Sequence, residues 1–431
     1  MSRILPARLA TAPAFLACLL ILSLFAASPT RAGLCSLDDV PAATLLLPYF
    51  EVDLDRPTAM TTLFSVSNAS ADPVLAKITL WSELAIPTLN FDIYLTGYDV
   101  VTLNLADLFR GTVPQTGDLL AGDFSRPNVA FPGCDAVLPQ GNLPQILIDH
   151  LQASHTGHAS AVYNNLCSGM DHGDTLARGF VTVDVVRECS FLFPDEPGYF
   201  GPEGIAGYDN VLWGDYYFVD QDNGFAQGEN LVRLEADPTA FGEGDYTFYA
   251  RYVGADGSDG REPLATTWAV RYLNGGAFTG GTDLIGWHDS KIAMEPFPCG
   301  TLPEEGLMGE DQIVIFDEDE NPNVLEVVCI WSFCPPGVDL SIFQFAATRV
   351  RVDSSDLPVP FDFGWMYFNL NDSTGGVLDP YSQGWLGYLH DATGLFSVGM
   401  GGTPLDSACE PMSRSLPVAG NVGGVAPGPV F

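Results

Sequence analysis

Alternation of apolar and polar residues in the middle of the chain predicts a run of β-strands. Three valines at alternate positions of residues 179–186 share one face, which is the period-2 pattern of a half-buried strand. Residues 211–219 repeat the pattern with aromatic side chains. Three strand-like runs follow, each with an arginine in its middle: LVRLEAD (231–237), YTFYARYVG (246–254) and TTWAVRYLN (266–274). Together these strands indicate the central sheet of an all-β protein.

Strand patterns also occur on both sides of this region. The run TLLLPYFE (44–51) is predicted to be an edge strand, because Pro48 cannot donate a hydrogen bond to a neighbouring strand. Further strands are predicted at residues 62–67, 74–81, 91–95, 100–105, 312–316, 324–331, 343–352, 361–370 and 395–398. Residues 145–152 have the best helical spacing. We therefore expect an all-β fold of two or three β-sandwich-like antiparallel domains with at most one or two short helices.

Targeting signals and breaks rich in proline and glycine divide the chain. Two arginines followed by 14 apolar residues predict a signal peptide over residues 1–32, too short to span a membrane. Residues 113–144 have the composition of a linker or functional loop. The expected units are a small immunoglobulin-like β-sandwich (33–112), a central β domain (145–298), a C-terminal β domain (299–410) and a flexible tail (411–431).

The charge of the chain limits its partners. There are 54 acidic residues against 17 lysines and arginines, so the net charge is −37. Nucleic acids and anionic lipids are bound through lysine and arginine contacts with phosphate. We therefore expect no nucleic-acid partner and no membrane span once the signal peptide is removed. The signal peptide itself predicts export to the periplasm, the cell surface or the extracellular space.

The cysteines support the same compartment. Of nine cysteines only Cys18 lies in the predicted signal peptide, and an even number in an exported chain predicts disulfide bonds. The chain has no Cys-x-x-Cys pair, which disfavours a thiolate metal site. Cys329 and Cys334, five residues apart, are predicted to bond to each other.

Several segments are similar to one known group of proteins. The segments are LLLPYFEVDL, FDIYLTGYDV, ARGFVTVDVV, VLWGDYYFVD and REPLATTWAVRYLNGGAFTGGTDLI. They resemble a family of exported bacterial β-rich proteins to which no activity is assigned. The resemblance would cover most of the chain after the signal peptide. It implies export, and it transfers no catalytic residue or ligand.

Common catalytic motifs are absent from the sequence. There is neither a Gly-x-Ser-x-Gly pentapeptide nor a His-Glu-x-x-His motif. His150, His155, His158 and His172 cluster with three aspartates, and such side chains can hold zinc. Their spacing fits no standard zinc site, however, and the segment has the composition of an exposed loop. We therefore expect solvated histidines.

Two acidic stretches are candidate calcium loops. One contains Asp220 and Asp222, and the other contains Asp317 and Asp319. Oxygen ligands at alternate residues are the first half of an EF-hand loop, but neither stretch has the required glycine and glutamate in place. The competing interpretation is a turn stabilised by Asp and Asn side chains. Calcium is the one cofactor that the sequence suggests.

Three arginines form the remaining pattern. Arg233, Arg251 and Arg271 are predicted to lie in adjacent antiparallel strands, because the connections are short and contain no crossover helix. Their side chains would either pair with carboxylates or line a groove for an anionic ligand such as an acidic sugar. Trp213 or Trp268 would then be stacking platforms.

These patterns favour a secreted, non-catalytic binding or structural protein of β-sandwich type. Its partner would be an extracellular glycan or protein, and calcium is a candidate stabilising ion. The alternative is a secreted glycan-active hydrolase, because a pair of catalytic carboxylates needs no sequence motif.

Overall fold

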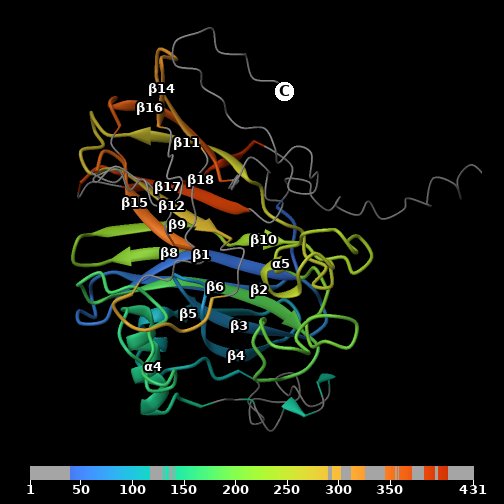
Figure 1. The fold of residues 1–431 in the computed structure, drawn as a ribbon. Coiled ribbons are helices and arrows are strands. Elements are labelled where there is room, and N and C mark those ends of the chain that lie inside the picture. The colour runs from blue at the N-terminus through green and yellow to red at the C-terminus, as the bar shows by residue number, and fades with distance from the viewer. Residues whose placement is uncertain are drawn as a thin grey trace, which may run out of the picture.

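The computed structural model describes residues 39–116, 130–131, 133–134, 138, 141–289, 294–301, 312–325, 345–354, 357, 359–370, 383–393 and 397–405. The predicted signal peptide, the tail and the Cys329–Cys334 pair lie outside these residues. The described part of the chain folds into four antiparallel sheets, which confirms the all-β prediction. Figure 1 shows the sheets stacked from β16 at one end to helix α4 at the other.

Two sheets are built mainly from the first half of the chain, and each is named here after one of its strands. The β6 sheet has the order β10-β1-β6-β3-β4, and the β8 sheet has the order β5-β2-β8-β9 with β7 also paired to β2. The β6 sheet contains β1 (Thr44–Asp53), β3 (Val74–Ser82), β4 (Pro87–Leu95), β6 (Leu176–Val186) and β10 (Val232–Leu234). The β8 sheet contains β2 (Thr61–Asn68), β5 (Val100–Asn104), β7 (Leu212–Trp213), β8 (Asp215–Asp220) and β9 (Phe225–Asn230).

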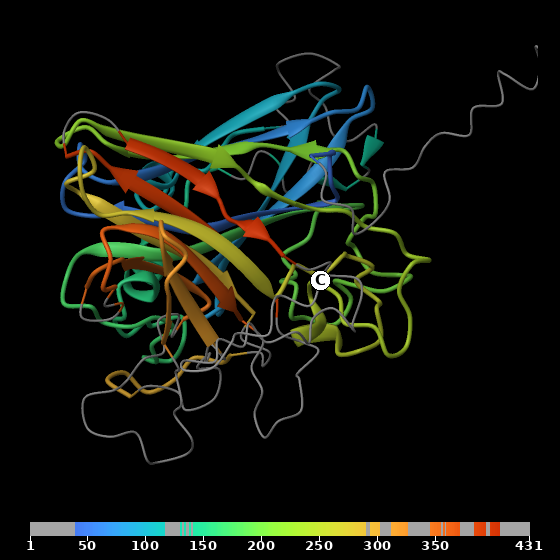
Figure 2. The same cartoon turned by 90° about the horizontal axis from the view of Figure 1, so that it is seen from above.

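The other two sheets come mainly from the second half. The β12 sheet has the order β15-β12-β17-β18, and the β16 sheet has the order β14-β13-β16-β11-β19. The β12 sheet contains β12 (Gly281–His288), β15 (Ala347–Arg351), β17 (Gly384–Asp391) and β18 (Ser397–Gly401). The β16 sheet contains β11 (Thr267–Leu273), β13 (Gln312–Asp317), β14 (Pro322–Leu325), β16 (Phe363–Asn369) and β19 (Thr403–Pro404). Figure 2 shows the red strand β18 running beside the light-green strands of the β8 sheet, and β18 contacts β9.

Helices are short in the described residues. They are α2 (Leu105–Leu108), α4 (Gln145–His155) and α5 (Ala250–Val253). The α4 helix confirms the helix predicted at 145–152 and packs against β4 and β6. The two others are single turns.

The predicted unit boundaries do not coincide with the sheets. The β6 and β8 sheets each combine strands from 33–112 with strands from 145–298. The β12 and β16 sheets each combine strands from 145–298 with strands from 299–410. Spacing along the sequence suggests that neighbouring strands pair, whereas here many hydrogen-bonded strands are more than 100 residues apart.

Strand β1 lies inside its sheet. All ten of its residues are buried, and it pairs with β10 on one side and β6 on the other. The predicted edge position was therefore wrong. Pro48 is accommodated because the pairing with β6 shifts register between Leu47 and Phe50, so that proline lies at a bulge rather than in the ladder.

A row of polar residues crosses the buried β6 sheet. Asp92, Lys77, Asp184 and Thr44 are neighbours on four adjacent strands. The Lys77 ammonium lies 2.8 Å from the Asp92 carboxylate, and neither side chain is exposed. Lys77 also donates to the Ser190 carbonyl at 2.5 Å. Thr44 donates to the Asp184 carboxylate at 2.5 Å. A charged pair is therefore part of the core.

Two disulfides connect distant parts of the described chain. Cys134 bonds to Cys189, 55 residues away, and Cys167 bonds to Cys299, 132 residues away. For these four cysteines they confirm the predicted disulfide bonds. The second bond ties the loop after α4 to the segment that precedes β13.

Candidate functional site

The outward side of the β8 sheet carries two exposed aromatic rings. Strand β2 pairs with β7 and β8 in one continuous register, from Ser67 opposite Trp213 to Thr61 opposite Val219. Side chains alternate between the two sides of a strand, so Trp213 and Tyr217 lie on the same side. They are 40% and 45% exposed. At about 3.3 Å per residue they are separated by about 13 Å along the sheet.

Polar side chains surround these rings. Asp215 lies between them on the same side and accepts a hydrogen bond from Ser65 at 2.5 Å. The register places Thr102 and Asn230 in the row of Asp215, and both are exposed. We call this surface the aromatic face: Val100, Thr102, Trp213, Asp215, Tyr217 and Asn230. It presents aromatic rings next to hydroxyl, carboxylate and amide groups.

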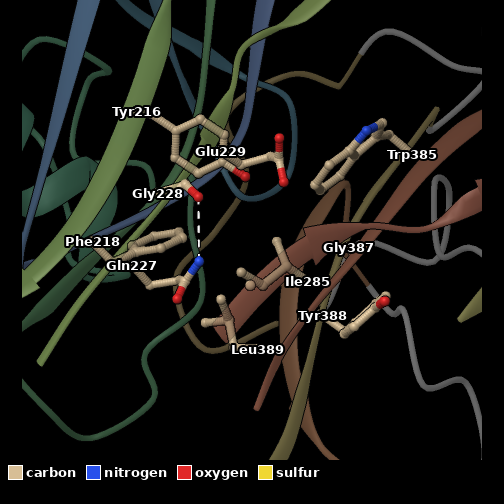
Figure 3. Close-up of a pocket in the computed structure, with 11 residues that line it drawn as sticks. Tyr216, Phe218, Gln227, Gly228, Glu229, Ile285, Trp385, Gly387, Tyr388 and Leu389 are labelled. Carbon is tan, nitrogen blue, oxygen red and sulfur yellow. Dashed lines mark hydrogen bonds between the residues drawn. The ribbon is translucent and has the colours of Figure 1, made fainter. Parts of the chain in front are cut away.

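Behind the aromatic face, a narrow gap separates the β8 sheet from the β12 sheet (Figure 3). Inward side chains of β8 and β9 form one wall, and residues of β12 and β17 form the other. The lining residues are Tyr216, Phe218, Gln227, Gly228, Glu229, Ile285, Trp385, Gly387, Tyr388, Leu389 and Gly399. Figure 3 shows the Glu229 carboxylate between Tyr216 and Trp385.

This gap does not assemble the carboxylate pair that a glycosidase needs. Its lining residues include one acid, Glu229, whose carboxylate accepts the N–H groups of Asn230 at 3.0 Å and Gly401 at 3.2 Å. A glycosidase uses two carboxyl groups about 5–10 Å apart. Among the described residues, the gap therefore gives no support to the hydrolase alternative.

The three predicted arginines are not on adjacent strands of one sheet. Arg233 lies on β10 and Arg271 on β11 of a different sheet, whereas Arg251 lies in α5. The predicted strand at 246–254 was wrong, because the Tyr249 N–H bonds to the Asp259 carboxylate at 2.9 Å and the chain turns there. The groove of three arginines is thus not formed.

Each of these arginines has an acidic partner. Arg233 lies 3.2 Å from Asp39, Arg251 2.5 Å from Asp289, and Arg271 3.1 Å from Glu318. The carboxylate-pairing interpretation therefore describes all three better than an anionic-ligand groove.

The two predicted stacking platforms differ in exposure. Trp213 is part of the aromatic face, as described above. Trp268 is 4% exposed and donates its indole N–H to the Ala265 carbonyl at 3.3 Å, so it belongs to the core of the β16 sheet. The prediction that it could be a platform was wrong. Aromatic residues in strands are more often core than surface.

The candidate calcium residues form turns. The Asp220 carboxylate accepts hydrogen bonds from the backbone and side chain of Asn223 at 3.1 and 2.7 Å. The Asp317 carboxylate accepts hydrogen bonds from the backbone and side chain of Asn321 and from the Asp319 N–H. No group of three potential metal ligands is found within the described residues. The structure thus favours the turn interpretation for both stretches.

The histidine cluster divides into buried and exposed members. His150 and His155 are each 3% exposed, so the prediction of solvated side chains was wrong for them. His155 is hydrogen-bonded to Thr88 and to the Arg178 carbonyl, both at 2.8 Å, and burial lowers its pKa to about 4. His158 and His172 are exposed, as predicted.

Replacing His172 by glutamine is expected to remove a pH-dependent part of the stability. Buried Glu83 accepts a hydrogen bond from His172 at 2.9 Å, and this bond raises the pKa of His172. The wild type should therefore be more stable than the variant below about pH 6.5. This difference in stability should vanish as the pH rises through the raised pKa of His172. Thermal melting of both proteins between about pH 5.5 and 9 checks this. An advantage that persists at alkaline pH would contradict it.

Comparison of the chain with protein-family models, with curated proteins and with solved structures finds no match. The resemblance to exported bacterial proteins therefore remains a prediction. Among the described residues no helix has the length and apolar character needed to cross a membrane.

Proposed function

We propose that this is an exported, non-catalytic binding protein that holds a neutral glycan on its aromatic face. The observation that carries the proposal is the pair of exposed rings, Trp213 and Tyr217, on one side of a sheet with polar groups between and beside them. Aromatic rings offer a flat apolar surface to the C–H side of a sugar. Hydroxyl, carboxylate and amide groups beside them can hydrogen-bond to sugar hydroxyls.

Charge and disulfides support the remaining parts of the proposal. A net charge of −37 repels anionic polymers, which favours a neutral ligand over an acidic one. Two disulfides fit an oxidising compartment outside the cytosol. The other side of the sheet packs on the core, since the opposite side chains of β8, Tyr216 and Phe218, are buried.

Binding to neutral polysaccharides tests the proposal. The wild type should bind at least one member of a panel of uncharged polysaccharides in a pull-down assay, and calorimetry with its oligosaccharide should give a measurable Kd. Trp213→Ala and Tyr217→Ala should each weaken binding about three- to tenfold, which corresponds to the loss of one aromatic contact.

Trp365 provides a matched control. It is 41% exposed but lies on β16, in another sheet. Trp365→Ala should leave glycan binding unchanged. Equal losses in all three variants, or no binding of any neutral polysaccharide by the wild type, would contradict the proposal. Release of reducing sugar during the assay would instead favour the hydrolase.

A further inference from the structure

The side chains of the aromatic face are ordered in three rows that cross the strands. Paired residues of neighbouring strands lie side by side, so the register defines which side chains share a row. Trp213 lies in the first row with Val100, and Tyr217 lies in the third row. The second row lies between them and contains Asn230, Asp215, Ser65 and Thr102. A polar row therefore separates two apolar rows along the direction of the strands.

The position of the Tyr217 ring depends on a glycine in the neighbouring strand. Tyr217 of β8 pairs with Gly228 of β9. A Cβ atom added at Gly228 would lie 2.2 Å from Tyr217 Cδ1 and 2.3 Å from Cε1. The ring therefore occupies the space over β9 that the side chain of any other residue would need. It leans across the sheet rather than standing away from it, and it is still 45% exposed.

The polar row offers hydrogen-bonding groups between the two rings. One Asp215 oxygen accepts a hydrogen bond from Ser65 at 2.5 Å, and the other lies 3.4 Å from the Tyr217 hydroxyl. Thr102 and Asn230 are exposed in the same row. Carboxylate, hydroxyl and amide groups can each bind a sugar hydroxyl. A sugar unit that crosses this row would thus be held by hydrogen bonds rather than by stacking.

The distance between the rings determines how long a ligand must be to reach both. Trp213 and Tyr217 are about 13 Å apart along the sheet, because four residue steps separate them. One pyranose ring is shorter than this distance and cannot contact both. A ligand that does so is a chain of about three or more units, with at least one unit over the polar row.

The placement of the rings also determines the shape of the chain. Both rings lie on the same side of one sheet, on strands β7 and β8 that follow each other along β2. A ligand on both must therefore turn apolar C–H faces toward the sheet at two separate units. An extended ribbon of pyranoses with equatorial linkages does this, whereas a helical chain turns its successive faces in different directions.

We propose that the aromatic face binds an extended, ribbon-like segment of a neutral β-linked polysaccharide, which runs along β7 and β8. One sugar unit lies on Trp213, a later unit lies on Tyr217, and the unit between them lies over Asp215. The net charge of −37 favours a neutral chain over an acidic one. This inference rests on the proposed function and adds the length, shape and direction of the ligand.

A series of oligosaccharides of increasing length tests the inference. The probes are β-1,4-linked gluco- and manno-oligosaccharides of two to six units, with binding to the full chain measured by calorimetry. In at least one series, the six-unit chain should bind at least tenfold more tightly than the two-unit chain, because only the longer chain contacts both rings. One six-unit chain should bind per protein. Maltohexaose, a helical chain of the same sugar as cellohexaose, should bind at least tenfold more weakly than the better ribbon.

Three variants show whether both rings act on one chain. Trp213→Ala and Tyr217→Ala should each remove most of the gain in affinity from two to six units. Gly228→Ala retains both rings but displaces that of Tyr217, so it should remove the same gain and change the affinity for the two-unit chain less than about twofold. Phe191→Ala is the control, because Phe191 is 75% exposed but lies outside the β8 sheet. It should leave every affinity unchanged.

Failure of this inference is distinguishable from failure of the proposed function. Equal affinity for two and six units, two six-unit chains per protein, or a preference for maltohexaose would overturn the inference. So would binding of other neutral glycans only. In each case, loss of binding in the two ring variants would still support the proposed function. Absence of binding to every neutral glycan would contradict both. If Gly228→Ala does not fold, the ring variants and the wild-type series still decide.

Discussion

Replacing Asp92 by asparagine is expected to destabilise the protein by about 3–5 kcal/mol. The Lys77 ammonium lies 2.8 Å from the Asp92 carboxylate, and both side chains are fully buried. Without the carboxylate, the charge of Lys77 remains in the core without its ion-pair partner, and this is the costly state. The loss is measured as the change in free energy of unfolding in urea.

Two companion variants separate the cause from a general packing defect. Replacing both partners, Lys77→Met with Asp92→Leu, removes both charges and should restore most of the lost stability. Arg271→Ala breaks an ion pair with Glu318 that is largely exposed, and it should cost less than about 1 kcal/mol. If Asp92→Asn lowered the free energy of unfolding no more than Arg271→Ala does, the prediction that the buried pair stabilises the core would be wrong.

Removing the Cys167–Cys299 disulfide by alanine substitution at both positions should cost up to about 5 kcal/mol. The bond closes a loop of 132 residues, and the entropy that a disulfide removes from the unfolded chain grows with loop length. The variant should unfold at a lower urea concentration than the wild type.

The second disulfide is the natural comparison. Cys134–Cys189 spans 55 residues, so its removal should cost slightly less, about 4 kcal/mol. Wild-type stability in the Cys167→Ala/Cys299→Ala protein would contradict the prediction. Thiol titration of the denatured, unreduced wild type checks independently that these four cysteines are oxidised.

Strands were predictable wherever a short-range pattern decides the structure. The alternating valines of 179–186 lie within β6 (Leu176–Val186), and TTWAVRYLN contains β11 (Thr267–Leu273). In both cases the local pattern identifies the strand. The prediction that residues 179–186 are half-buried was wrong, because β6 lies inside its sheet and both of its sides are buried there.

Features that depend on distant residues were not predictable. YTFYARYVG has a strand-like composition. However, the Asp259 carboxylate accepts a hydrogen bond from the Tyr249 N–H, and the Asp289 carboxylate forms an ion pair with Arg251. These contacts outweigh the local preference and give the single turn α5. Likewise, the pairing of β1 with β6 joins residues more than 120 positions apart, and nothing in either strand specifies its partner.

The candidate site was predictable only in part, because the alternation of side chains is local, whereas their exposure depends on distant residues. Trp213 was predicted to be a stacking platform. The alternation in WGDYYFVD also implies that Asp215 and Tyr217 lie on the same side of the strand as Trp213. Which side faces solvent depends on the other sheets, so the same reasoning wrongly selected Trp268. His155 became buried because Thr88, 67 residues earlier, supplies a hydrogen-bond partner.

During synthesis, β1 and β3 are made well before the strand that lies between them. Strand β6 ends about 100 residues after β3, and a ribosome adds about 5–20 residues per second. For about 5–20 s, therefore, β1 and one edge of β3 have no partner to complete their hydrogen bonds. Both strands consist of residues that the finished fold buries, and exposed apolar edges pair with other chains. Nascent chains that end before Leu176 should consequently aggregate, and those that extend past Val186 should be the first in which this sheet can close.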